Sequence, residues 1–63
     1  MSERVVTQIC ETESNGYSTV QVISTDEYGD QHVGTGTYEN DTWHTSSDRE
    51  EAYQRATEQS LYD

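Results

Sequence analysis

Residues 17–38, YSTVQVISTDEYGDQHVGTGTY, decide the fold of this chain. Apolar and polar residues alternate over 17–25 and again over 31–38, among many good strand formers, and this period of two is typical of β-strands. The segment between them, 26–30, is polar and contains a glycine, as hairpin loops do. The stretch therefore predicts two antiparallel strands joined by a hairpin.

Two glycines on the second of these strands predict what packs against it. Gly34 and Gly36 are two residues apart and so fall on one face. Glycine weakens a strand unless another element approaches closely. We therefore expect a C-terminal helix to lie over this face.

A further strand is expected before the hairpin, over residues 4–13, and the turn signal Ser14-Asn15-Gly16 follows it. Its alternation places on one face Val5, Thr7 and Ile9, and on the other Val6, Gln8 and Cys10.

The predicted helix covers residues from about Asp48 to Leu61. Ser47 and Glu50 have the spacing of a capping box, which makes Ser47 the expected N-cap. Two interpretations of residues 42–45 stay open: a short fourth strand, or a connection into the helix. A narrow apolar stripe supports the helix and consists of Ala52, Tyr53, Ala56 and Leu61.

Together these elements predict an α+β fold: an antiparallel meander of three or four strands with one C-terminal helix packed on one face. We expect a single domain over residues 1–63, close to the smallest size at which one core suffices. Trp43 is the expected buried anchor of that core. The other expected core residues are Val5, Val6, Ile9, Val20, Val22, Ile23, Val33 and Leu61.

The charge of the chain restricts its partners. It has 13 Asp and Glu against 3 Arg and no Lys, for a net charge of -10. Such a surface repels nucleic acid and anionic membranes, so direct binding to either is not expected. The mean hydropathy of -1.10 is also typical of disordered chains. The absence of proline and the grouping of β-branched residues into short runs favour a folded domain.

The cysteine content and the N-terminus suggest a compartment. Cys10 is the one cysteine, so an internal disulfide framework is excluded. No apolar stretch has the length of a signal peptide or a membrane span. We expect a cytoplasmic location, in a bacterium, an archaeon or an infected host.

Residues that could carry chemistry are few. Cys10, His32 and His44 do not have the spacing of zinc ligands, and the acidic loop 26–30 lacks the alternating ligands of a calcium-binding loop. A chain this short also has little room for a substrate cavity. We expect neither a cofactor nor an enzymatic activity.

Part of the sequence resembles the second half of a double-stranded-RNA-binding domain, in which a glycine-rich strand leads to a helix. The similar segments are 20–23, 34–36 and 46–52. Those domains hold phosphates with a lysine pair at the start of the helix, where this chain has Asp48 and Arg49. The resemblance implies a topology and not an RNA-binding function.

The acidic residues themselves carry the functional prediction. The candidate partner-binding residues are Glu11, Glu13, Asp26, Glu27, Asp30, Asp48, Glu50, Glu51 and Glu58. In composition the chain resembles small acidic phage-encoded inhibitors of host defence, including DNA-mimicking anti-CRISPR proteins. That resemblance implies an inhibitor that occupies the basic surface of a nucleic-acid-binding protein, and a homodimer is a further expected state.

An alternative hypothesis is a small domain from a high-salt cytoplasm, in which surface acids keep the protein hydrated and bind no charged partner. The two hypotheses differ in charge distribution. A mimic gathers its acids on one side, whereas a halophilic domain scatters them.

Overall fold

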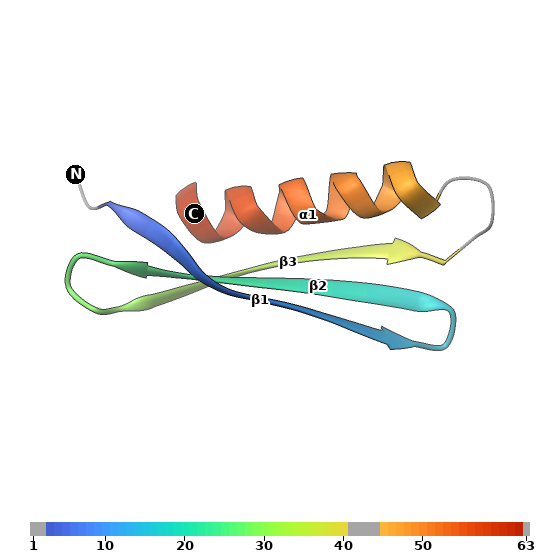
Figure 1. The fold of residues 1–63 in the computed structure, drawn as a ribbon, viewed down its shortest axis with the longest axis horizontal. Helices are drawn as coiled ribbons and strands as arrows, with labels where there is room; N and C mark the ends of the chain where they lie inside the picture. Colours follow the sequence, from blue (N-terminus) through green and yellow to red (C-terminus); the bar gives the residue numbers. More distant parts are fainter. Residues whose placement is uncertain (1–2, 41–44, 63) are drawn as a thin grey trace.

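The computed structural model describes residues 3–40 and 45–62. Three strands, β1 (Arg4–Ser14), β2 (Tyr17–Asp26) and β3 (Gln31–Glu39), form one antiparallel sheet in the order β1-β2-β3, and the helix α1 (Thr45–Tyr62) follows. Figure 1 shows α1 lying lengthwise along one face of the sheet. The predicted α+β meander with a C-terminal helix is therefore confirmed.

The start of the helix differs from the prediction. It begins at Thr45, so Ser47 lies inside the first turn and is not the N-cap. Three consecutive Ser or Thr residues occupy 45–47, and all are of types that cap helices, so the sequence alone does not fix where the helix begins. Thr45 belongs to the helix, and the remainder of the proposed fourth strand, 42–44, lies outside the described residues.

Two tight turns set the register of the sheet. Asn15 and Gly16 have φ values of 54° and 81°, as the two central residues of a type I′ hairpin turn require. In the β2–β3 hairpin the Asp26 carboxylate accepts hydrogen bonds from the backbone N–H groups of Tyr28 and Asp30, both at 2.9 Å. The turns lie where the sequence predicts them.

A β-bulge in β1 changes which side chains face the helix. The register passes from Val6 opposite Ser24 to Gln8 opposite Ile23, which leaves Thr7 as the extra residue. Beyond the bulge Ile9 lies opposite the buried Val22, on the side of the helix. The prediction that Ile9 shares a face with Val5 is therefore wrong, because a single inserted residue reverses the alternation.

The glycines of β3 let the helix approach the sheet closely. A Cβ atom on Gly34 would overlap the carbonyl oxygen of Ala56, and one on Gly36 would overlap that of Ala52. The Ser24 hydroxyl, between the same layers, donates a 2.6 Å hydrogen bond to the carbonyl of Ser60. The expected packing of the helix over these glycines is confirmed.

The core is smaller than the sequence predicts. Among the described residues the buried hydrophobic ones are Val20, Val22, Tyr38, Ala52 and Ala56. Three predicted core residues are instead exposed, namely Val5, Ile9 and Val33. Ile9 is exposed because α1 lies mainly over β2 and β3, whereas the other two face away from the helix.

The remaining residues of the predicted core, apart from the buried Val20 and Val22, are neither fully buried nor exposed, or lie outside the described residues. Val6, Ile23 and Leu61 are half-buried, and Trp43 lies outside the described residues.

The face of the sheet opposite α1 has no element over it within the described residues, and we call it the open sheet face. Its members follow from the strand register and are Val5, Gln8, Cys10, Thr12, Ser14, Tyr17, Thr19, Gln21, Ile23, Thr25, Gln31, Val33, Thr35, Thr37 and Glu39. None of them is buried, and Glu39 alone in this set carries a charge.

Candidate functional site

The acidic residues predicted to bind a partner fall into three groups. They are Glu11 and Glu13 on β1, Asp26, Glu27 and Asp30 around the β2–β3 hairpin, and Asp48, Glu50, Glu51 and Glu58 on α1. Glu11 and Glu13 lie opposite the buried Val20 and Ser18, so both are on the helix side of the sheet. No member of the three groups belongs to the open sheet face.

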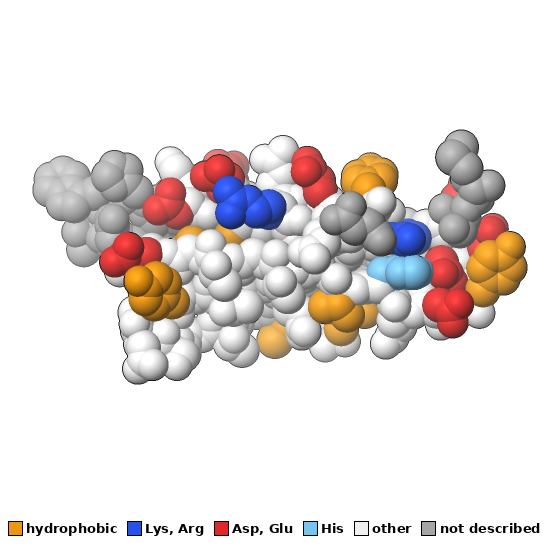
Figure 2. Space-filling view, turned by 180° about the vertical axis from the view of Figure 1, so that it is seen from behind, with side chains coloured by type: hydrophobic (Ala, Val, Ile, Leu, Met, Phe, Trp, Pro, Cys, Tyr) orange, Lys and Arg blue, Asp and Glu red, His pale blue; other side chains and the backbone are white. Residues whose placement is uncertain are grey.

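Figure 2 shows, from behind, where the acidic side chains lie relative to the helix and the sheet. Red carboxylate side chains lie along the helix and at the ends of the molecule, whereas the sheet below the helix is mostly white with orange patches. In this view the carboxylates therefore gather along the helix and at the ends of the molecule.

One row of charges follows the exposed side of α1. Asp48, Glu51, Arg55 and Glu58 are spaced three or four residues apart and share this side. Arg55 interrupts the row with an ion pair to Glu51 at 3.3 Å, but about two thirds of each side chain is exposed. Exposed pairs of this kind contribute about 0–1 kcal/mol, so Glu51 remains available to a partner.

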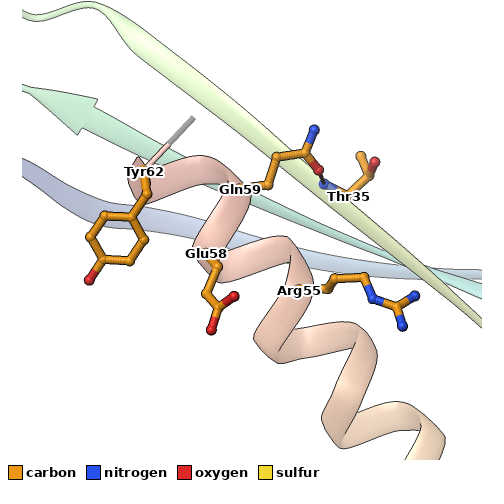
Figure 3. Close-up of a pocket in the computed structure, with 5 residues that line it drawn as sticks. All are labelled: Thr35, Arg55, Glu58, Gln59 and Tyr62. Carbon is orange, nitrogen blue, oxygen red and sulfur yellow. Dashed lines mark hydrogen bonds between the residues drawn. The ribbon is translucent and has the colours of Figure 1, made fainter.

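A shallow depression of about 320 Å³ lies between this row and β3. Figure 3 shows its lining: Arg55, Glu58, Gln59 and Tyr62 come from α1, and Thr35 comes from β3. The Gln59 amide oxygen accepts a 3.1 Å hydrogen bond from the backbone N–H of Thr35. The guanidinium, carboxylate and phenol at this place can hydrogen-bond polar side chains of a partner.

Glu11 belongs to an internal hydrogen-bond cluster. The Tyr38 hydroxyl donates to one of its carboxylate oxygens, while the Tyr53 hydroxyl donates to the other at 2.7 Å. Arg49 donates to that second oxygen at 3.2 Å and also stacks over the Tyr53 ring, 5.1 Å from its centroid. These hydrogen bonds lower the pKa of Glu11 to about 2. The bond from the Tyr38 hydroxyl has the largest effect, followed by the bond from the Tyr53 hydroxyl and then by that from the Arg49 guanidinium. This carboxylate therefore ties β1 to β3 and α1.

Asp26 is engaged in a similar way. Its side chain is only 8% exposed, and its second oxygen lies 2.8 Å from Nε2 of His32. The hydrogen bond from His32, followed by the backbone N–H groups of Asp30 and Tyr28, lowers the pKa of Asp26. Glu27 and Asp30, by contrast, are exposed at the hairpin tip.

The sequence predicts neither of these two roles for Glu11 and Asp26. Tyr38, Arg49 and Tyr53 carry no local signal for the Glu11 cluster, because they come together only when three elements meet. The Asp26 turn had a signal, since an Asp at the start of a polar glycine loop commonly accepts from the backbone two residues on.

A metal centre would require several of the candidate ligands to lie together in the described part of the chain. Among residues 3–40 and 45–62, no three His, Cys, Asp or Glu side chains gather as metal ligands. Cys10 is exposed on the open sheet face, His32 bonds to Asp26, and His44 lies outside the described residues. In the same part of the chain, no helix combines the length and the apolar character that a membrane span requires.

No family model, curated protein or solved structure matches this chain. The distribution of its charges is therefore the main evidence on which a function can be proposed.

Proposed function

We propose that this chain is a small protein-binding inhibitor that occupies a basic, nucleic-acid-binding surface of a partner protein by mimicking nucleic acid. The surface that makes the contact, which we call the acidic side, consists of Glu13, Glu27, Asp30, Asp48, Glu50, Glu51 and Glu58. The observation that supports this function is the absence of these acids from the open sheet face. A domain that used acids for hydration alone would place them on that exposed face as well.

The helix gives the acidic side a fixed length. Asp48 and Glu58 are ten residues apart, which corresponds to about 15 Å along an α-helix. Phosphates of one DNA strand rise about 3.4 Å each, so the row extends over roughly four of them. A basic groove that exchanges counterions for phosphates will also exchange them for carboxylates held at this scale.

Two of the predicted residues contribute less to this surface. The carboxylates of Glu11 and Asp26 already accept hydrogen bonds within the fold, so a basic partner would compete with those bonds. The proposed contact therefore rests on the acids of α1, of which Asp48 is half-buried, and on the exposed acids of the hairpin tip.

Affinity capture from a lysate of the source cells or their host tests the proposal. The immobilised chain should retain a basic protein at about 50 mM salt and lose it at about 500 mM. Added double-stranded DNA should release the captured protein, because both ligands compete for one groove. Glu50→Gln with Glu51→Gln should weaken capture severalfold, mainly by slowing association.

Glu3→Gln with Glu39→Gln is the matched control, since it removes the same charge from residues outside the acidic side. Capture that persists at high salt, that DNA does not reverse, or that both double variants weaken equally would refute nucleic-acid mimicry.

A further inference from the structure

The open sheet face is exposed, partly apolar and nearly uncharged. Val5, Tyr17 and Val33 are 64%, 55% and 48% exposed, and Val33 lies beside Ile23 in the register. About a quarter to a third of the residues on a protein surface are ordinarily charged. On this face the one charge is Glu39, at a corner opposite Tyr17. In a chain of net charge -10, that composition is unexpected for a surface meant for solvent.

The buried core of the chain is also small. It contains two valines, one tyrosine and two alanines among the described hydrophobic residues. Domains near 60 residues bury only about 60% of their unfolded surface, and oligomerisation is one way in which such small domains gain further burial. The open sheet face is a continuous surface from which this chain could gain such burial.

Electrostatics favours one occupant for this face. A basic partner gains no charge attraction from a nearly uncharged face, whereas a second copy of this chain meets less like charge there than at the acidic side. If two sheets pack about 10 Å apart and each helix adds about 10 Å, the two helices are about 30 Å apart. That separation exceeds the Debye length of about 8 Å at physiological salt, so the acids on the two helices barely repel each other.

From these observations we propose that the open sheet face is a homodimer interface that packs against the same face of a second copy. The product is a four-layer particle with the order helix, sheet, sheet, helix. If the two copies run antiparallel, their acidic hairpin tips lie at opposite ends of a particle at least 41 Å long.

The face has enough area for such a dimer. Three strands about 4.8 Å apart and about nine residues long cover roughly 14 by 30 Å. The accessible area of side chains exceeds this projection, so two copies bury on the order of 1,000 Å² in total, at the lower end of specific interfaces. The expected dissociation constant is therefore about micromolar or weaker, and the dimer forms at high protein concentration.

Gln21 lies at the centre of the interface, in the row that contains Cys10 and Thr35. Sedimentation equilibrium from about 10 μM to 1 mM should show a rise from 7.2 kDa to twice that mass. Gln21→Glu should raise the dissociation constant at least about tenfold, because it brings two like charges together. Gln54→Glu is the matched control on the outer side of α1 and should leave the dissociation constant unchanged.

Two further measurements use the same protein. The dimer should strengthen as salt rises from about 50 to 500 mM, since salt screens the repulsion between two acidic copies. The Cys10 thiol should react more slowly with a disulfide reagent as dimer forms. A parent chain that stays at 7.2 kDa at about 1 mM overturns the proposal. So does a dimer that Gln21→Glu leaves intact, because it would form through another surface.

Discussion

The helix side and the open side of the sheet are built from the same three strands, yet they differ in both packing and charge. On the helix side, Gly34 and Gly36 remove side chains so that backbones approach, and carboxylates surround the contact. On the open side, threonine, glutamine and valine fill the same strands, and charge is nearly absent. In a strongly acidic chain, the uncharged surface is therefore as informative about function as the charged one.

The close packing of the helix side is the feature whose disruption should cost the most stability. Gly34→Ala should destabilise the fold by about 3 kcal/mol, because the new Cβ overlaps backbone atoms of α1 that cannot move alone. Thr35→Ala, the next residue but on the open sheet face, should cost less than about 1 kcal/mol. Urea unfolding followed by circular dichroism measures both. Equal costs would mean that the two sides are packed alike.

The Glu11 cluster should make stability on the helix side depend on acid. The pKa of Glu11 is about 2 in the folded chain and 4.5 as the ordinary value, so its contribution is present above about pH 4.5 and is lost as the pH falls toward 2. Glu11→Gln should be less stable than the parent at pH 6. The difference between their free energies of unfolding should become smaller near pH 2. Glu13→Gln, an exposed neighbour on the same side of β1, is the control. A difference in unfolding free energy between Glu11→Gln and the parent that does not change with pH would contradict the stabilising role of the Glu11 carboxylate.

A substitution on α1 should change binding at the acidic side without changing the homodimer at the open sheet face. Arg55→Gln removes the cation from the acidic row of α1 and should tighten binding of the captured basic protein a fewfold at about 50 mM salt. The same variant should leave the homodimer dissociation constant unchanged, because α1 is remote from the open sheet face. Calorimetric titration and sedimentation of one preparation give both values. Weaker binding to the partner would place Arg55 itself in the contact.

The start of the helix should tolerate a substitution at Ser47 with little loss of stability. Ser47→Ala should change the free energy of unfolding by no more than about 0.5 kcal/mol, since Ser47 is an exposed residue inside the first turn and not the cap. A loss of about 1 kcal/mol in thermal or urea unfolding would restore Ser47 as the N-cap.

The strands, the turns and the packing over the glycines could be predicted because each has a local pattern. Alternation marks β2 and β3, Asn15-Gly16 marks the turn, and glycines on one face predict a close neighbour. The bulge at Thr7 could not be predicted, because one inserted residue leaves the composition of β1 unchanged while it reverses the face of Ile9.

The candidate site could be predicted as a set of acids but not as a surface. Whether Glu11 and Asp26 are free depends on Tyr38, Tyr53 and His32, which reach them only in the folded chain. The uncharged character of the open sheet face depends on the register of all three strands, so the sequence alone did not reveal it.

The bulge at Thr7 also determines how far an assembly of this chain can grow. An unpaired strand edge invites further strands and, in the extreme, fibrils. On β1 the bulge distorts that edge, and the exposed carboxylate of Glu13 opposes an incoming strand. On β3 the backbone N–H of Thr35 is already bonded to Gln59. With both edges obstructed, the sheet resists elongation, and concentrated solutions should remain free of amyloid.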